Sequence, residues 1–251
     1  MNYNRVLKLA DYEDFGITRR KQWEVAMALL TLRDFGAVHD DAEILGVGAG
    51  RERTIYVLSG QVRRVFATDL YLDAGSWSGW HGPDFLRTPW AFAPEDVAFD
   101  DRRIVAQHAD MRRLPYPDDT FDGIFSSGSI EHVGVEGTFD SQAIEKAASE
   151  IGRVLKPGGV ASLSTEWKIA GDGWGWSHVR LFDEGLLMRH IVEPSGLDMV
   201  DELDTETDFD LNDYTVLEDV VMRGYEPEVE ALMKEHQFLY TSVHLALRKP
   251  A

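Results

Sequence analysis

Residues 42–50 read AEILGVGAG, an apolar run that leads directly into three alternating glycines. The next segment, ERTIYVLSG (residues 52–60), has the spacing of a short helix. Glycines between a strand and a helix let the backbone turn tightly and approach a bound ligand closely. A dinucleotide-binding fingerprint would need glycine or alanine at position 51, so Arg51 disfavours a nicotinamide oxidoreductase. A tight turn without any ligand is the alternative for the glycines alone.

The rest of the chain alternates strand-like segments with helix-like ones. Further strands are expected at residues 63–70, 102–110, 121–129, 159–167, 197–203 and 238–249, and helices at 18–35, 141–155 and near 182–196. Another helix is expected in the acidic segment that ends near His236. Alternating strands and helices imply right-handed crossovers and a parallel sheet. The predicted fold class is therefore α/β, and the pattern leaves open whether the last strand is antiparallel.

Length and composition limit the class of protein. The 251 residues fit one domain spanning 1–251, with lid-like insertions at about 71–101 and 167–180. No run of eighteen apolar residues predicts a membrane span, the N-terminus lacks a signal-peptide pattern, and the chain has no cysteine. The formal net charge of −19 opposes binding to phosphate backbones. We therefore expect a cytoplasmic protein with no membrane span and no nucleic-acid partner.

Acidic residues follow two of the predicted strands. Asp69, with Leu70 beside it, ends one strand, and Asp110 precedes Met111 at the end of the next. In open α/β sheets, ligands bind at the carboxyl ends of the strands. A carboxylate such as that of Asp69 can accept hydrogen bonds from a ribose diol, and an acid beside an apolar side chain suits an adenine ring. Either aspartate alone could be a helix N-cap, but together with the glycines they favour a nucleoside ligand.

Four segments resemble, in order, the pattern of class I S-adenosylmethionine-dependent methyltransferases. They are AEILGVGAG, FATDLY, HADMRRLPYPDDTFDGIFSSGSIEH and EIGRVLKPGGVASLSTEW, within residues 40–168. The resemblance implies a Rossmann-like fold with a mostly parallel seven-stranded sheet flanked by helices, and S-adenosylmethionine as cofactor. The cofactor contacts that it implies are Gly46, Gly48 and Gly50 at the methionine part, Asp69 and Leu70 at the ribose, Asp110 and Met111 at the adenine, and Ser127 beside the cofactor.

One position departs from the family pattern. The family has an acid two residues before the first glycine, where this chain has Ile44. Glu43 is one residue earlier, and on a strand its side chain would face the opposite side. The sequence therefore leaves open which group makes that cofactor contact.

Three polar residues are candidates for the catalytic step. Methyl transfer mainly requires alignment of the nucleophile, but a neutral hydroxyl also loses a proton, and histidine is the natural base. His132, in the run GSIEH directly after the predicted fourth strand, is the first candidate, and His178 is the second. Glu131 could orient a base or hold a metal. A turn or capping role is the alternative for His132.

Tryptophans gather in the two insertions. Trp77 and Trp80 lie in the first, and Trp174 and Trp176 lie in the second. Both insertions leave the carboxyl edge of the predicted sheet, where the acceptor must bind. Indole faces stack on sugar rings and equally on aromatic acceptors. We therefore expect a Trp-rich lid that binds the substrate, although packing within the lid would also account for these residues.

The chain is also similar to a narrower group, the bacterial methyltransferases of glycan and polysaccharide biosynthesis, through RRKQWEVAMALL and the GSIEH run. That resemblance implies O-methylation of a sugar hydroxyl, such as the 1-hydroxyl of a methylated mannoside, and is compatible with a magnesium requirement. The alternatives are a natural-product or protein side-chain methyltransferase and a non-catalytic S-adenosylmethionine-binding protein. The expected partners are a small-molecule or oligosaccharide acceptor and a second copy of the chain, since homodimers are the commonest assembly of soluble enzymes.

Overall fold

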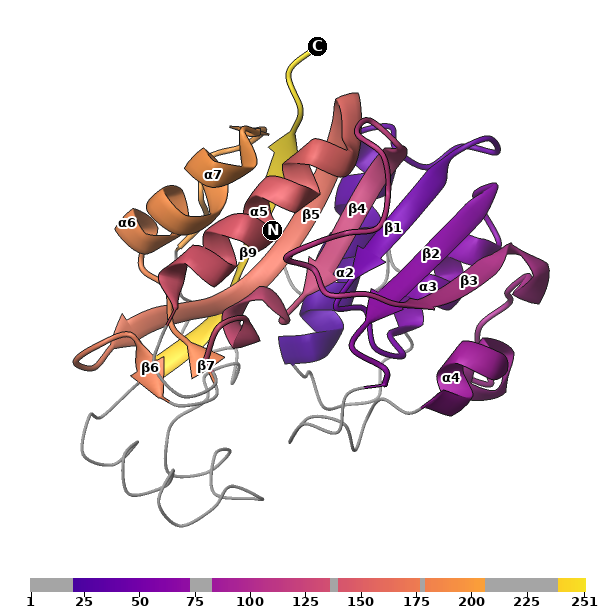
Figure 1. Ribbon diagram of the computed structural model, residues 1–251, viewed down its shortest axis with the longest axis horizontal. Coiled ribbons are helices and arrows are strands. Elements are labelled where there is room, and N and C mark those ends of the chain that lie inside the picture. Colours follow the sequence, from indigo (N-terminus) through magenta and orange to yellow (C-terminus); the bar gives the residue numbers. More distant parts are fainter. Residues whose placement is uncertain (1–19, 73–82, 136–139, 177–178, 206–238) are drawn as a thin grey trace.

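The computed structural model describes residues 20–72, 83–135, 140–176, 179–205 and 239–251. Its centre is a seven-stranded sheet in the order β3-β2-β1-β4-β5-β9-β8 (Figure 1). The strands of this sheet are β1 (Glu43–Val47), β2 (Arg64–Asp69), β3 (Ile104–His108), β4 (Phe121–Ser127), β5 (Leu155–Ala170), β8 (Asp198–Met199) and β9 (Leu239–Arg248). A separate hairpin consists of β6 (Gly175–Trp176) and β7 (Val179–Arg180).

The direction of the strands confirms the predicted α/β class. Strand β1 runs parallel to β2 and β4, and β3 and β5 extend the parallel part on either side. Strand β9 is antiparallel to both β5 and β8, which answers the question that the sequence pattern left open. The chain builds β2 and β3 on one side of β1 and then returns to build β4 on the other side. In such sheets the reversal of strand order between β1 and β4 creates a crevice at the carboxyl edge.

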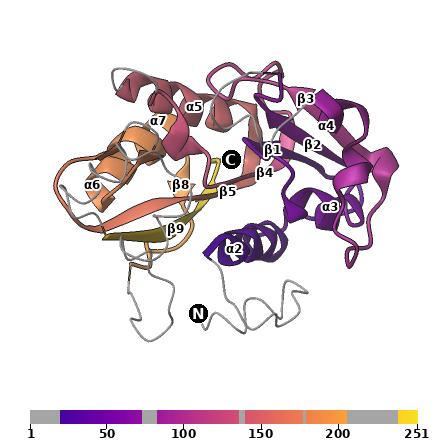
Figure 2. The same ribbon diagram turned by 90° about the horizontal axis from the view of Figure 1, so that it is seen from below.

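Helices cover both faces of the sheet (Figure 2). On one face lie α2 (Arg20–Asp34) and α3 (Arg53–Ser59), and on the other lie α5 (Ser141–Val154), α6 (Glu184–Leu187) and α7 (Glu193–Ser195). The remaining described helical elements are α4 (Pro83–Arg87), the 3-10 turns η1 (Pro89–Phe92), η2 (Asp101–Arg103) and η3 (Ile130–His132), and the π-helical turn η4 (Met188–Val192) between α6 and α7.

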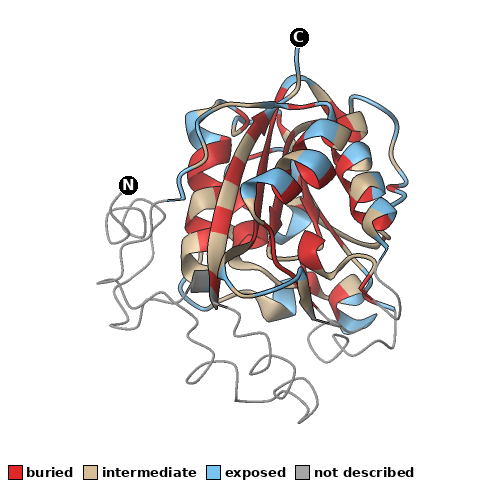
Figure 3. Cartoon of the chain, turned by 90° about the vertical axis from the view of Figure 1, so that its left-hand side faces the viewer, coloured by how far each residue is buried: buried red, intermediate tan, exposed pale blue. Residues whose placement is uncertain are grey.

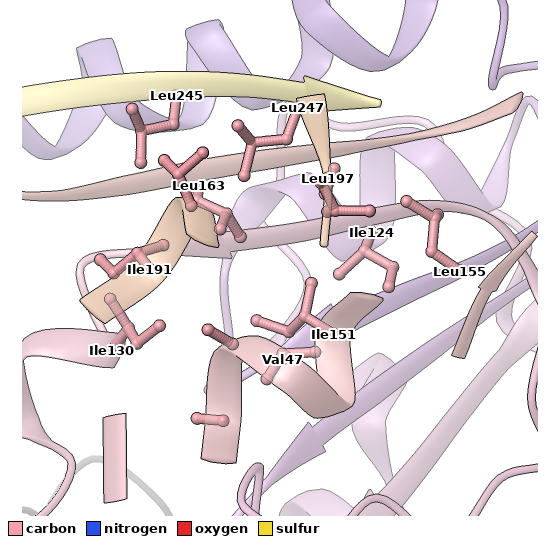
Figure 4. Close-up of a cluster of buried hydrophobic side chains, with 14 of the residues drawn as sticks. Val47, Ile124, Ile130, Ile151, Leu155, Leu163, Ile191, Leu197, Leu245 and Leu247 are labelled. Atoms are coloured by element: carbon pink, nitrogen blue, oxygen red, sulfur yellow. The ribbon is translucent and has the colours of Figure 1, made fainter. Parts of the chain in front are cut away.

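Each helical layer closes its own hydrophobic core against the sheet. Ile44 and Leu45 are neighbours on β1, yet Ile44 enters the core beneath α2 and α3 while Leu45 enters the core beneath α5. This alternation follows from the two-residue period of a strand. Figure 4 shows the second core, in which Ile151 of α5 lies among aliphatic side chains of the sheet such as Leu163. The strands are accordingly buried and the outer helix faces exposed (Figure 3).

Helix α5 shows how local sequence sets these elements. Asp140 caps its N-terminus by accepting a hydrogen bond from the Gln142 amide at 3.0 Å. Alanine and isoleucine side chains form its buried stripe. The helix ends at Val154, because the chain becomes extended at Leu155 before the Pro157-Gly158 step. Strand β5 therefore begins earlier than predicted, and β8 is shorter than the predicted 197–203.

Some predicted features lie outside the described residues. These are Trp77, Trp80, His178, the side chain of Trp176 and the helix expected before His236. The described part of the first insertion holds α4 and η1. Among the described helices, none has the length and apolar character needed to cross a membrane.

Candidate active site

The glycine turn after β1 forms as predicted and leaves no room for side chains. Gly48 and Gly50 have positive φ angles of 61° and 49°, which favour glycine. A Cβ atom on Gly48 would lie 2.5 Å from Ser129 Cβ and 3.0 Å from Met111 Cε. The Ser129 hydroxyl donates a hydrogen bond to the Gly48 carbonyl at 2.7 Å. The turn is therefore held against the end of β4, and the Met111 side chain lies next to it.

Gly46 has a different environment from the other two glycines. It lies within β1 and is paired with Ala67 and Phe125. A Cβ atom there would lie 2.5 Å from Phe125 Cζ. Packing against the neighbouring strand thus requires glycine at this position, and its contact with a cofactor stays a prediction.

Asp69, the last residue of β2, is fixed by two backbone amides. Its Oδ2 atom accepts a hydrogen bond from the Gly50 amide at 2.9 Å, and its Oδ1 atom accepts one from the Leu70 amide at 2.6 Å. The Tyr71 hydroxyl donates to the Gly50 carbonyl at 2.7 Å from the same side. Each carboxylate oxygen has a second lone pair, so Asp69 can still accept hydrogen bonds from a diol.

Asp110 lies two residues beyond the end of β3, in a turn. Its Oδ1 atom accepts a hydrogen bond from the Arg112 amide at 2.9 Å, and its Oδ2 atom is 2.6 Å from a guanidinium nitrogen of Arg112. The guanidinium hydrogen bonds of Arg112 hold the pKa of Asp110 below its usual range. No helix follows Asp110 in the described residues, so it is not a helix N-cap; its carboxylate is ionised and already accepts hydrogen bonds from Arg112.

The structure also shows where Ile44 and Glu43 lie, the two residues at and beside the position where the family has an acid. Ile44 is fully buried in the core. Glu43 is the first residue of β1, at the amino end of the strand, where its backbone amide donates to Asp122. Neither residue places a carboxylate at the carboxyl edge. Ser127 does end β4 at that edge, and it is 5% exposed.

Glu131 and His132 are brought together in η3, the turn that follows β4. The Glu131 side chain is fully buried, and its Oε2 atom accepts a hydrogen bond from the Thr165 hydroxyl at 3.0 Å. Its Oε1 atom has no hydrogen-bond partner in the described part of the chain and lies 3.8 Å from Nε2 of His132. Burial raises the pKa of Glu131 to about 7, against the opposing effect of the Lys21 ammonium. The result is a partly exposed imidazole beside a buried carboxyl group.

The first turn of α2 adds charged groups that the sequence analysis missed. Lys21 Nζ lies 2.9 Å from Oε2 of the fully buried Glu24. The Ser242 hydroxyl, from β9, donates a hydrogen bond to the other oxygen of Glu24. Gly128, with a φ of 64°, makes room for the Lys21 ammonium, which would collide with any Cβ atom there. No sequence signal relates Glu24 to Ser242, because 218 positions separate them.

The second insertion is anchored to the carboxyl end of β5 (Figure 1). The Phe182 amide donates to the Glu166 carbonyl, and the Lys168 amide donates to the Phe182 carbonyl. Strand β7 packs against η3. Trp174 precedes β6, is 36% exposed, and meets the His190 ring at a centroid distance of 5.4 Å. Trp174 is thus the one lid tryptophan of the four predicted whose side chain the described residues include.

Comparisons with known proteins agree with this geometry. A family model described as a methyltransferase domain matches residues 45–163. The YcgJ protein of Bacillus subtilis is similar in structure, with a TM-score of 0.58 at 16% identity over 90% of this chain and 98% of that one. So is phosphoethanolamine N-methyltransferase 2 of Haemonchus contortus in complex with S-adenosylmethionine, with a TM-score of 0.58 at 16% identity over 100% of this chain and 60% of that one.

A third similar structure is the 1,6-didemethyltoxoflavin N1-methyltransferase of Burkholderia thailandensis with bound S-adenosylhomocysteine. Its TM-score is 0.55 at 18% identity over 99% of this chain and 84% of that one. A comparison with curated proteins finds no match. The family match covers the glycine turn, both aspartates and η3. The match of residues 45–163 and the shared fold support an S-adenosylmethionine-dependent methyltransferase.

The residues at the carboxyl edge fit this cofactor. The turn at Gly48 and Gly50 lets a ligand approach the backbone, and Asp69 offers fixed acceptors for a diol. The Ser127 hydroxyl lies at the end of the adjacent strand β4. For magnesium the described residues give no such support, because they contain no group of three or more His, Asp or Glu that could hold a metal ion.

Proposed function

We propose that this methyltransferase methylates a hydroxyl group of a polar, sugar-like acceptor and that His132 is the general base. When bound, S-adenosylmethionine supplies a methyl group that is already activated by its sulfonium sulfur. What remains for the protein is to position the acceptor and to remove the hydroxyl proton. The observation that carries the proposal is the pairing of His132 with the buried Glu131 directly after β4.

The pairing suits His132 to this step. A carboxylate next to an imidazole stabilises the imidazolium that forms when the base takes a proton. The 3.8 Å separation between Nε2 and Oε1 allows this electrostatic support without a direct hydrogen bond. His132 is only partly buried, so an acceptor hydroxyl can reach it. In this role His132 receives the proton, and Glu131 is a positioning residue.

The charged surroundings favour a polar acceptor. Lys21, Glu24 and Glu131 meet at the same edge of the sheet as His132. An aromatic or aliphatic acceptor would remove water from these ionisable groups without replacing its hydrogen bonds, which costs free energy. The hydroxyl groups of a polar acceptor can replace those hydrogen bonds. Trp174 adds an exposed indole on the β6–β7 side, and such a face can stack on a sugar ring.

Mass spectrometry on a panel of acceptors tests the proposal. The protein and S-adenosylmethionine are incubated, with and without magnesium, with partly methylated manno-oligosaccharides, other sugars, aromatic compounds and amines. We expect one added methyl group on a sugar, with fragmentation locating it on an oxygen. Methylation of aromatic or amine acceptors alone would overturn the proposal. The narrower acceptor, the 1-hydroxyl of a methylated mannoside, is identified only if fragmentation places the methyl group there.

A further inference from the structure

Glu52 is an acid near the cofactor edge to which neither the sequence pattern nor the proposed chemistry gives a role. It follows the glycine turn by two residues and is the N-cap residue of α3. Its side chain makes no capping hydrogen bond, unlike that of Asp140 in α5. Glu52 as a whole is half-buried, but its Oε2 atom is buried and, among the described residues, has no hydrogen-bond partner.

The carboxyl group of Glu52 lies on the β4 side of the crevice. The Ser127 hydroxyl interacts with it there, and the charge of Asp69 acts on it from the end of β2. Ser127 is itself more than nine-tenths buried. The Oε2 atom of Glu52 is thus a buried acceptor that no described residue satisfies. Buried polar atoms without a protein partner usually form a hydrogen bond with a ligand or a water molecule.

The direction of the cofactor indicates which of its groups would meet Glu52. Asp110 and Met111 follow β3, Asp69 ends β2, and Ser127, which interacts with Glu52, ends β4. If the adenine lies at β3 and the ribose at β2, the amino-acid end of the cofactor extends toward β4. That end carries an ammonium group, which donates three hydrogen bonds and needs acceptors.

We propose that Glu52 binds the ammonium group of S-adenosylmethionine and supplies the carboxylate that Ile44 cannot supply. The Ser127 hydroxyl is a second acceptor for the same group. The proposal rests on the family's cofactor and is independent of the acceptor proposed above. Glu43, at the opposite end of β1, is excluded from this role by its position.

The protonation of Glu52 gives the proposal a second readout. Burial raises the pKa of the free Glu52 carboxyl to about 8; the charged groups that act on it are Lys21 and Glu24 from α2 and Asp69 from β2, and Tyr71 is also near. An ammonium partner favours the ionised form and lowers that pKa. Binding at pH 7 should therefore release a proton, which calorimetry in buffers of different ionisation enthalpy detects, and the Glu52→Gln variant should not release it.

Calorimetry with two ligands tests the contact itself. S-adenosylhomocysteine carries the ammonium group, whereas 5′-methylthioadenosine lacks the whole amino-acid end. We expect Glu52→Gln to weaken S-adenosylhomocysteine binding at least tenfold, since a charge-assisted hydrogen bond becomes a neutral one, and to change 5′-methylthioadenosine binding less than twofold. The matched control Glu43→Gln should bind both ligands as the wild type does.

Other outcomes would overturn the proposal. Equal losses for both ligands would mean that the substitution distorts the glycine turn, and unchanged binding of both would mean that Glu52 makes no contact. The variant should fold, because glutamine resembles the protonated carboxyl in size and charge; a thermal melt checks this. If it does not fold, Glu52→Asp must show the same selective loss in smaller degree. Failure of the wild type to bind S-adenosylhomocysteine would overturn the cofactor assignment together with the role of Glu52.

Discussion

The Asp69 carboxylate accepts a hydrogen bond from the Gly50 amide at 2.9 Å and so joins the end of β2 to the turn that follows β1. Its second oxygen accepts from the Leu70 amide. The carboxylate is therefore held in one orientation by the backbone before any ligand binds. Such preorganisation lowers the entropic cost of binding, since the acceptor is already in place.

Asp69→Ala should weaken binding of S-adenosylhomocysteine by more than about 1 kcal/mol, because it removes charge-assisted acceptors for the ribose and the tie to Gly50. Asp69→Asn is the matched variant: it keeps one oxygen acceptor but no charge, and we expect an intermediate loss. Calorimetry measures both. An affinity equal to that of the wild type for both variants would exclude Asp69 from the binding site.

Gly48→Ala should weaken cofactor binding as well as lower the stability of the protein. The new Cβ atom would meet Ser129 at 2.5 Å in a backbone conformation with positive φ. Gly36→Ala is the control, because Gly36 also has positive φ but has nothing within 4 Å of an added Cβ atom. Gly36→Ala should lose about 1 kcal/mol of stability from backbone strain, and Gly48→Ala should lose more because of the contact with Ser129; thermal melting measures both.

Only Gly48→Ala should also lose cofactor affinity, by about tenfold or more, the scale set by 1.4 kcal/mol. Equal affinities for the two glycine variants would mean that the turn at Gly48 does not contact the ligand.

Glu131→Gln should stabilise the unliganded protein at pH 8 and leave it nearly unchanged at pH 5. Burial raises the Glu131 pKa from 4.5 to about 7, so the folded state holds its proton more tightly than the unfolded state. The contribution of Glu131 to the free energy of unfolding is fully present below pH 4.5 and is lost as the pH rises through 7. Melting temperatures of both proteins across this range measure the difference, at about 2–4 °C for each kcal/mol. A variant that melts lower than the wild type at pH 8 would contradict this reasoning.

Trp174→Ala should raise the KM for a sugar acceptor about fivefold to tenfold, the scale of one lost stacking contact, without changing cofactor affinity. Trp90→Ala is the matched control, since Trp90 is exposed in η1, far along the chain from the β6–β7 hairpin. An equal KM for the two variants would remove Trp174 from the acceptor site.

Much of the scaffold could be predicted because it is encoded locally. The strand before the glycines, the acid at the end of β2 and the helix 141–155 each have a signal within a dozen residues, namely apolar runs, glycine turns and capping residues. The parallel direction of β1 to β5 follows from the alternation of strands and helices along the chain. The antiparallel β9 did not follow, because no local pattern states which neighbour a final strand joins.

The charged part of the site could not be predicted in the same way. Lys21 and Glu24 have the appearance of ordinary polar positions on an amphipathic helix, and only the fold brings them against Gly128 and Ser242. Glu52 occupies the N-cap position of α3, although its side chain does not cap the helix. These roles depend on contacts between distant segments, which hydrophobic periodicity does not report.

The most direct test of the proposed function is methyl transfer to a sugar acceptor by the wild type and His132→Ala across pH 5–9. We expect the variant to bind S-adenosylhomocysteine normally and to lose about a hundredfold or more in kcat, the usual scale for a lost general base. His39→Ala, at an exposed position, should behave as the wild type. Wild-type turnover in His132→Ala at every pH would contradict the account, because the base would then lie elsewhere.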